Sequence, residues 1–391
     1  MPDVFFSRQP LVNRQSKIIA TRLSLHLGDN NGSKDAVEAL NALGDVWPSG
    51  EKSIFVNCGE TPCDIGLLDW PAPENATIEL RSASLVGADA GEFVAALQTR
   101  QPALCLDFDA QAAQAIATGT RFRFIAFDAK AFNPEQLKTL VGKTQPYGIG
   151  IAFNVDSATQ FQDCLDAGLN AAASWFFKQP TSAPAKALNP GQAQIIRVLN
   201  LVRRNANVKE IEAALKSDVA LSYKLLRYIN SAGFGLSCEI QSFSHAVTIL
   251  GYDKLNKWLS LLLATASKDP MAPALMYTAL TRARLMELLT HGLVDRSEYD
   301  NLFITGAFSL LDALLGVEME QALEAMHLPE PICDALLGKG GLYGPFLDLA
   351  LACEGNDGKA IAEQAGMLGL SADQLNRAQL QALAFADTME F

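Results

Sequence analysis

Histidine and cysteine are the side chains of this sequence that most readily ligate metals, and their spacing shows whether they can do so together. The four histidines lie far apart and none precedes an aspartate: His26, His245, His291 and His327. The seven cysteines are scattered, odd in number and never in CxxC spacing. Zinc sites and disulfide frameworks need partners at close, recurring spacing. The sequence therefore predicts free, mostly buried thiols in a reducing compartment, with neither disulfides nor a zinc site.

Two further motifs lack residues that their chemistry requires. The stretch Gly338–Gly344 is rich in glycine, but it lacks the GxxxxGK[ST] pattern of a phosphate-binding loop and no strand precedes it, which favours an interhelical loop. Arg203-Arg204 and Arg282–Arg284 are short basic stretches, which more often stay solvated or pair with nearby acids. Acids outnumber bases 43 to 31, giving a net charge of −12, so we expect no nucleic-acid partner.

Composition indicates a folded protein of two domains. The chain has 391 residues, of which 49% are hydrophobic and 19% charged, enough apolar side chain for sizeable cores. No apolar run reaches the roughly 18 residues that cross a bilayer, and Met1–Phe5 has no basic region ahead of an apolar stretch. We therefore expect no membrane partner, no secretion signal and a cytoplasmic location.

The first half of the chain alternates strand and helix patterns, which must position any site it holds. Short β-rich runs occur at Val4–Ser7, Lys17–Leu23, Ser53–Asn57, Thr77–Leu80, Ala103–Asp107, Phe122–Asp128 and Gly148–Asn154. Between them, Asn133–Glu135 has the pattern of a helix N-cap followed by proline, and Ser157–Gln160 that of a capping box. Repeated strand–helix units predict a mainly parallel sheet, open or closed into a barrel.

The strand pattern stops near residue 180. Residues 179–189 hold two prolines and little apolar bulk, which is typical of a linker. Apolar residues then repeat at helical spacing, for example over Leu275–His291 and Glu298–Leu315. We predict an α/β domain over residues 1–178, a linker over 179–189 and an all-α domain over 190–391.

Several motifs of the second half occur together and in order: Ile211–Ala213, Asp218–Ser222, Lys224–Ala232 and Ser242–Gly251. They closely resemble the HDOD domain of bacterial signalling proteins, a catalytically silent relative of HD-type phosphohydrolases. Gly306–Gly316 and Leu349–Glu354 resemble the C-terminal part of a branch in which an EAL-type domain comes first. Phe6–Pro10 resembles the opening of an EAL domain, and Phe176-Phe177 its close. The resemblance implies a degenerate EAL-type, TIM-like β/α barrel followed by an all-α HDOD domain.

An active EAL domain hydrolyses cyclic di-GMP with divalent metals that carboxylates and an asparagine hold, assisted by a lysine and a glutamate. By this resemblance the chain keeps four of the residues: Asn57, Glu79, Asp107 and Asp128. Five positions depart from the pattern: Arg22 at the signature glutamate, Leu106 at the first paired aspartate, Ala126 at the lysine, Phe153 at the late glutamate and Ala173 at the closing glutamine. A guanidinium cannot ligate a metal and repels one. We therefore expect no two-metal site, no catalytic residues and no phosphodiesterase activity.

Two interpretations of the kept residues stay open. They either cap loops at strand ends and pair with Arg81, Arg121 or Arg123, or they form, with Arg22, a relict pocket for a metal or nucleotide. Arg22 itself either pairs with Glu79 or grips a phosphate. The HD-type metal pair is missing, because the chain has no His-Asp dipeptide, so we expect no metal or cofactor in the second domain.

The resemblance implies a regulatory protein of bacterial signal transduction. With neither catalytic set complete, we expect a non-catalytic protein that acts through contacts with other signalling proteins. A sensor that binds cyclic di-GMP without cutting it is one alternative, and a cryptic phosphohydrolase is another. The apolar stretch Trp258–Leu263 is a candidate interface, although a buried core is the simpler explanation of it.

Overall fold

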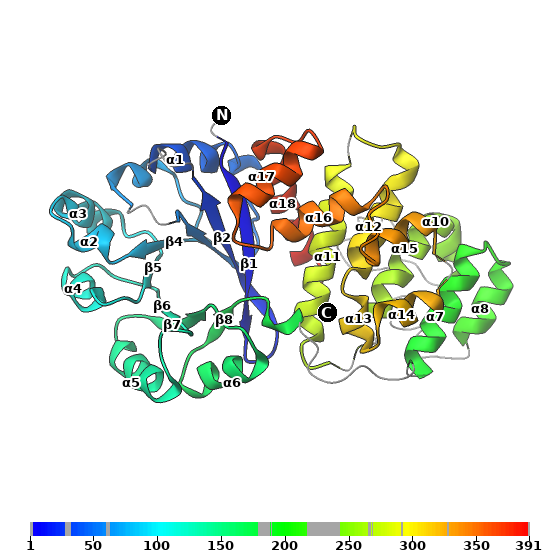
Figure 1. The fold of residues 1–391 in the computed structure, drawn as a ribbon, viewed down its shortest axis with the longest axis horizontal. Coiled ribbons are helices and arrows are strands. Elements are labelled where there is room, and N and C mark those ends of the chain that lie inside the picture. The colour runs from blue at the N-terminus through cyan, green and yellow to red at the C-terminus, as the bar shows by residue number, and fades with distance from the viewer. Residues whose placement is uncertain are drawn as a thin grey trace. The chain divides into compact units, whose positions relative to one another are not determined.

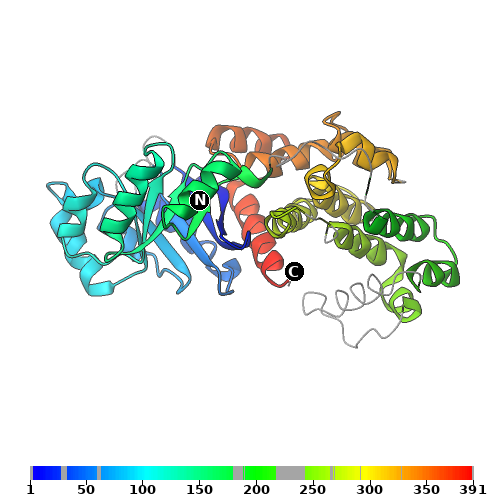
Figure 2. The same cartoon turned by 90° about the horizontal axis from the view of Figure 1, so that it is seen from below.

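The structure is a computed structural model that describes residues 3–27, 33–59, 63–178, 188, 190–216, 243–264, 267, 269–290, 292–326 and 328–389. Its backbone divides into two compact units, drawn from two sides in Figure 1 and Figure 2. The first unit comprises Met1–Gln179 with Leu351–Arg377, and the second comprises Pro180–Ala350 with Ala378–Phe391. The sequence placed residues 351–377 in the helical domain, whereas the structure groups them with the first half of the chain.

The first unit is built on eight strands that close into a barrel in sequence order (Figure 1). They are β1 Phe5–Asn13, β2 Ile18–His26, β3 Ser53–Asn57, β4 Ala76–Arg81, β5 Leu104–Asp107, β6 Phe124–Asp128, β7 Ile149–Phe153 and β8 Ala171–Ala173. Neighbours from β2 to β8 run parallel, whereas β1 runs antiparallel to both β2 and β8. The predicted β/α barrel is thus confirmed, and its closed form settles the choice between an open and a closed sheet.

Helices follow most strands and form the outer layer of the barrel (Figure 1). They are α1 Ser33–Asn41, α2 Ala83–Val86, α3 Ala90–Arg100, α4 Ala112–Ala117, α5 Pro134–Thr144 and α6 Ala158–Asp166, with the short 3₁₀ turns η1 Gly44–Val46, η2 Ile65–Asp69 and η3 Phe176–Lys178. Helix α5 begins at the predicted cap, because the Asn133 side chain accepts from the Gln136 amide and the Gln136 side chain returns a bond to the Asn133 backbone. Ser157 caps α6 through the Gln160 amide, but the Gln160 side chain accepts from the Asp156 amide instead of the Ser157 amide, so the predicted capping box is only half formed.

No helix separates β1 from β2, so another segment must bond the backbone groups on part of the β1 edge. Strand β8 pairs with β1 only at residues 11–13. Ahead of that pairing, the Phe6 amide donates to Oδ1 of Asn376 at 3.0 Å and the Arg8 amide donates to the Cys353 carbonyl at 2.8 Å. Residues 351–377 therefore bond to the strand edge that β8 leaves open. This explains why they belong to the barrel unit, since unpaired edge groups are costly when buried.

An ion-pair cluster fastens the same segment to the barrel. Glu354 bonds Nη2 of Arg8 at 3.1 Å, and both side chains are only 2% exposed. The ammonium of Lys178 contacts the other carboxylate oxygen of Glu354 and lies 3.8 Å from the centroid of the Trp175 ring. One buried carboxylate is therefore matched by two cations, which is the arrangement that burial of a charge requires.

The second unit is helical. Its described elements are α7 Pro190–Arg203, α8 Val208–Lys216, α10 Phe243–Ala264, α11 Ala272–Leu289, η5 Arg296–Glu298, α12 Tyr299–Phe308, α13 Leu311–Leu315, α14 Met319–Glu324 and α15 Glu330–Leu336. The C-terminal helices α16 Gly344–Ala352, α17 Gly358–Met367 and α18 Ala372–Asp387 complete the chain, with unit boundaries inside α16 and α18. The predicted all-α second half is confirmed in its class. None of the described helices combines the length and apolarity that crossing a bilayer requires.

Two local predictions need correction. The sequence predicted one helix over Glu298–Leu315, but α12 ends at Phe308 and α13 begins at Leu311. Strand β8 was missed, because its alanines carry neither β-branching nor alternation. The motifs Asp218–Ser222 and Lys224–Ala232 lie outside the described residues, as do His291, His327, the first residue of the motif Ser242–Gly251 and nearly all of the predicted linker. In the stretch Trp258–Leu263, Leu259, Leu262 and Leu263 are buried.

Candidate functional site

The residues predicted at the barrel site stand on successive parallel strands, at or near the ends where such strands finish. Arg22 lies on β2 and Glu79 on β4, while Asn57, Asp107 and Asp128 are the last residues of their strands. Side chains alternate along a strand, so residues two positions apart share a face. Ala20, Phe55, Cys105 and Ala126 are buried in the apolar cluster of the barrel interior, which sets Arg22, Asn57, Asp107 and Asp128 on the same inward face.

Arg22 and Glu79 form the centre of this site. Nε of Arg22 donates to both carboxylate oxygens of Glu79, at 2.8 and 3.0 Å. Nδ2 of Asn57 donates to Oε2 of the same carboxylate at 2.7 Å. The Glu79 side chain is 2% exposed and that of Arg22 is 15% exposed. A buried carboxylate is thus neutralised by a fixed guanidinium and held by an amide, which confirms the pairing alternative for Arg22.

An aromatic ring and an amide complete the surroundings of Arg22. The guanidinium carbon lies 4.2 Å from the centroid of the Phe153 ring, a distance at which a cation is attracted to the face of the ring. Nη1 of Arg22 contacts Oε1 of Gln9 at 3.4 Å. Sequence reasoning missed Gln9, because the register that pairs Gln9 with Arg22 follows from the antiparallel β1–β2 hairpin.

The charges of the site shift the ionisation of its members. Burial is the largest single influence and lowers the pKa of Arg22, but the charge and the hydrogen bond of Glu79, with the charges of Asp107 and Cys105, together outweigh it, so the pKa of Arg22 is raised. The pKa of Asp107 is raised by burial and by the nearby negative charge of Glu79, although Arg22 and Arg81 oppose the shift. Burial, with the charges of Glu79 and Asp107, raises the pKa of Cys105 well above its ordinary value. These shifts give the site a fixed cation and a carboxylate that takes up a proton more readily than usual.

Asp128 plays a different part from the other predicted residues. Its carboxylate accepts the backbone amide of Lys130 at 2.9 Å, which turns the chain after β6. No hydrogen bond or ion pair joins Asp128 to Arg22 or Glu79 in the described structure. The structure therefore brings Arg22, Asn57, Glu79 and Asp107 into one electrostatic group and gives Asp128 the loop-capping role.

The divalent metals that the EAL resemblance implies do not fit these residues. Both oxygens of Glu79 are occupied by Arg22 and Asn57, and a metal there would meet the repulsion of the guanidinium. Ala126, Phe153 and Ala173 are buried apolar side chains of the interior cluster. Within the described ranges, no three His, Cys, Asp or Glu side chains gather as metal ligands would. The chemistry of this donor set is that of an internal ion pair.

Comparison with known proteins shows which domain family the helical unit resembles. Residues 189–306 match the HDOD domain family. The chain contains an HDOD domain. The stretch covers α7, α8, α10, α11 and most of α12, so the HDOD domain lies wholly within the second half, as the motifs predicted.

Two curated relatives extend the comparison. A cyclic di-GMP phosphodiesterase of Vibrio cholerae, CdgJ, is 28% identical over 233 residues, which is 59% of this chain and 54% of that protein. The uncharacterised protein YuxH of Bacillus subtilis is 27% identical over 235 residues, 57% of this chain and 56% of its own. The chain thus spans about half the length of the curated relatives it matches. The family match is therefore to the HDOD domain over residues 189–306, and a closed barrel precedes it in the chain.

A solved structure also aligns with part of the chain. The EAL domain of FimX from Pseudomonas aeruginosa, bound to cyclic di-GMP, shares 18% identity and a TM-score of 0.35. The alignment covers 45% of this chain and 90% of that domain. A TM-score of this size is too low for geometry to be carried from one structure to the other.

Proposed function

We propose that this protein is a non-catalytic regulator in cyclic di-GMP signalling that acts through contacts with other signalling proteins. The observation that carries the proposal is the bond between Arg22 and Glu79. Metal-dependent hydrolysis of a phosphodiester needs cations that activate water and offset the charge of the phosphate. At this barrel the carboxylate that could hold such a cation is neutralised by a residue of the chain itself.

The apolar residues of the barrel interior support the same proposal. Ala126 and Phe153 carry no group that could transfer a proton or bind a phosphate oxygen, and both are buried. General acid–base catalysis requires a titratable side chain within hydrogen-bond reach of the reacting atoms. A barrel with this interior is folded but lacks these catalytic groups, as we expect of a protein that acts through contacts.

The test is a turnover assay on the full chain. The protein is incubated with cyclic di-GMP and Mg²⁺ or Mn²⁺, and the linear dinucleotide is measured by chromatography. We expect no product above the protein-free blank. The reversion Arg22→Glu is expected to remain inactive, because Ala126 and Phe153 still lack reactive groups. Linear dinucleotide formed by the unmodified chain, or by the reversion, contradicts the proposal.

Binding of cyclic di-GMP without cleavage is a second candidate, which the position of Arg22 favours. Its guanidinium uses Nε for both short bonds to Glu79, while Nη1 makes only a 3.4 Å contact to Gln9. Arginine has five donors, so some stay available for a phosphate oxygen beside the Phe153 ring. A titration of the full chain with cyclic di-GMP tests this. Heat of binding that Arg22→Met abolishes supports a sensor, and the absence of heat and of a thermal shift rejects it.

A further inference from the structure

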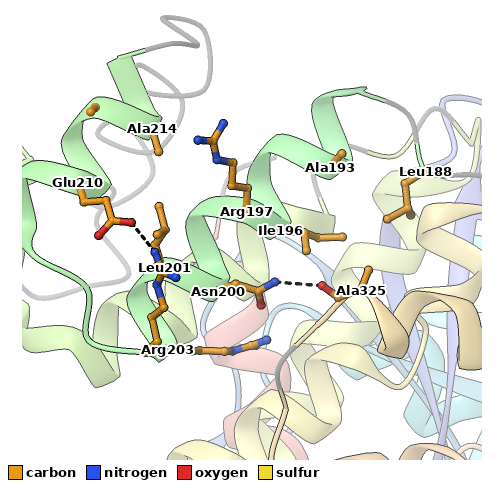
Figure 3. Close-up of a pocket in the computed structure, with 12 residues that line it drawn as sticks. Leu188, Ala193, Ile196, Arg197, Asn200, Leu201, Arg203, Glu210, Ala214 and Ala325 are labelled. Atoms are coloured by element: carbon orange, nitrogen blue, oxygen red, sulfur yellow. Dashed lines mark hydrogen bonds and ion pairs between the residues drawn. The ribbon is translucent and has the colours of Figure 1, made fainter.

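The helical unit contains a cavity of about 810 Å³, bordered by α7, α8 and the turn after α14 (Figure 3). Polar side chains of its lining bond to other residues of the same unit. Arg204 forms an ion pair with Glu210, and Nδ2 of Asn200 donates to the Ala325 carbonyl at 3.0 Å. These contacts hold the borders of the cavity to one another and indicate no particular class of ligand.

Two thiols of the barrel unit, in contrast, form a pair with a defined chemistry. Cys58 directly follows β3, and Cys63 lies two residues before the start of η2. Both are free cysteines. The S–H group of Cys63 donates a hydrogen bond to the sulfur of Cys58. Because a disulfide bond spans only about 2 Å, sulfur atoms that are already in contact need little movement to form one.

Each cysteine of this pair is held by its own neighbours. On the side of Cys58, Oδ1 of Asn57 accepts the Gly59 amide at 2.9 Å, and Gly59 has a φ of +78°, which glycine adopts without strain. On the other side, the Cys63 amide donates to Oγ of Ser84 on α2 at 2.9 Å. The end of β3 and the bond to α2 therefore bring the two sulfur atoms together, which raises the effective concentration of one thiol at the other.

The two thiols differ in their access to solvent. Cys58 is buried, at 6% exposure, whereas Cys63 is partly exposed, so a reagent in solution reaches Cys63 first. The hydrogen bond to Cys58, followed by burial, raises the pKa of Cys63 well above its ordinary value, although the charge of Arg81 opposes the shift. The pair is therefore held as thiols at neutral pH, and its exchange with a disulfide is slow, because the thiolate is the attacking species.

We propose that Cys58 and Cys63 are a redox site, which a low-molecular-weight disulfide such as glutathione disulfide converts to a reversible intramolecular disulfide. In a reducing compartment such a bond is transient, so the free thiols of the structure are its resting form. The bond would lie one residue from Asn57, whose amide holds Glu79. The site is independent of the function proposed for the barrel.

The reaction is a thiol–disulfide exchange in two steps. Cys63 releases its proton to solvent, and its thiolate attacks one sulfur of glutathione disulfide, which breaks the S–S bond of the oxidant and releases one glutathione thiolate. Cys58 then releases its proton and attacks the Cys63 sulfur of the mixed disulfide, which releases the second glutathione thiolate. The protein thus gives up two electrons and two protons, and the oxidant is reduced to two molecules of glutathione.

Redox equilibration of the full chain, followed by mass spectrometry, tests the proposal. The folded protein is brought to equilibrium in glutathione buffers of increasing oxidised fraction, remaining thiols are alkylated, and the chain is cleaved after glutamate. Glu60 lies between the two cysteines, so this cleavage leaves residues 52–60 and 61–74 joined only through the disulfide. We expect the joined peptides to account for most of the chain in glutathione disulfide alone and to be lost completely after dithiothreitol.

Variants separate the two steps of the exchange. Cys58→Ser is expected to abolish the joined peptides and to leave glutathione attached to Cys63, because the resolving thiol is missing. Cys333→Ser, at another partly exposed cysteine, is the matched control and is expected to form the joined peptides as the parent does. The parent chain decides the outcome even where a variant fails to fold. Cys58 and Cys63 that stay alkylated in glutathione disulfide, that each carry glutathione without joining, or that join only in urea overturn the proposal.

Discussion

Replacing Arg22 by methionine removes a charge from the centre of the barrel and leaves Glu79 with one neutral partner. Methionine preserves an unbranched, flexible side chain, so the change isolates the loss of the guanidinium. The Glu79 carboxylate would keep only the bond from Asn57, at 2.7 Å, and would remain 2% exposed. Breaking a buried ion pair by removing one partner costs about 3–5 kcal/mol.

The lower end of that range applies to this pair, because 15% of the Arg22 side chain is already exposed. We therefore expect Arg22→Met to reduce the free energy of unfolding by about 3 kcal/mol. A unit of roughly 200 residues loses about 2–4 °C per kcal/mol, which predicts a fall in Tm of about 6–12 °C. Calorimetry and urea titration of the full chain measure the two quantities independently.

A double-mutant cycle separates the pair from general packing. Adding Glu79→Gln to Arg22→Met removes the unpaired charge while preserving an acceptor for Asn57, so we expect at least about 1 kcal/mol of the loss to be recovered. Arg121→Met, at an exposed position of the same unit, serves as the control and is expected to change Tm little. A loss below about 1 kcal/mol for the single variant, or additive losses in the double variant, would refute the reasoning.

Three further outcomes follow from the structure. Asp107→Asn is expected to raise Tm at pH 7. Because the pKa of Asp107 is raised in the folded protein, its contribution to stability is present at low pH and is lost as the pH rises through the folded-state pKa. The difference in Tm between variant and parent should therefore shrink as the pH is lowered, and a difference that does not change with pH would contradict this. Glu354→Gln leaves Arg8 facing an amide at a site 2% exposed, and a loss of about 3–5 kcal/mol in urea unfolding is expected; less than 1 kcal/mol would show that the segment is held otherwise. Gly251 breaks α10 with φ 75° and ψ 172°, a backbone region nearly restricted to glycine. Gly251→Ala should therefore lower the free energy of unfolding by about 1–3 kcal/mol in urea unfolding. The control Gly142→Ala, at a helical site of α5 without close neighbours, should be neutral or stabilising.

Local patterns were enough to predict most of the barrel. Seven of its strands were foreseen because apolar runs and turn residues are short-range signals, and the caps at Asn133 and Ser157 were readable for the same reason. Strand β8 was not, because Ala171–Ala173 owes its pairing to neighbours on both sides rather than to its own propensity. The break at Phe308 was likewise invisible in a continuous apolar pattern.

Long-range contacts account for what the sequence could not predict. The resemblance identified Arg22 and Glu79 and left their pairing as one of two alternatives for Arg22, whereas the contacts of Arg22 with the Phe153 ring and Gln9 arise only in the closed sheet. The bonds from Phe6 to Asn376 and from Arg8 to Glu354 join residues more than 300 positions apart. Such long-range contacts produce no periodic pattern in the sequence, so the sequence assigned residues 351–377 to the helical half.

The cover that Cys353 and Asn376 give to β1 has a consequence for biosynthesis. A ribosome adds about 5–20 residues per second, so residues 351–377 emerge roughly 10–40 seconds after β8 has been made. Until then the amides of Phe6 and Arg8 have no partner from residues 351–377 and lie on an unpaired edge of β1, where a strand of another chain could pair. Translation of the helical half therefore sets the earliest moment at which the barrel at the front of the chain can finish folding.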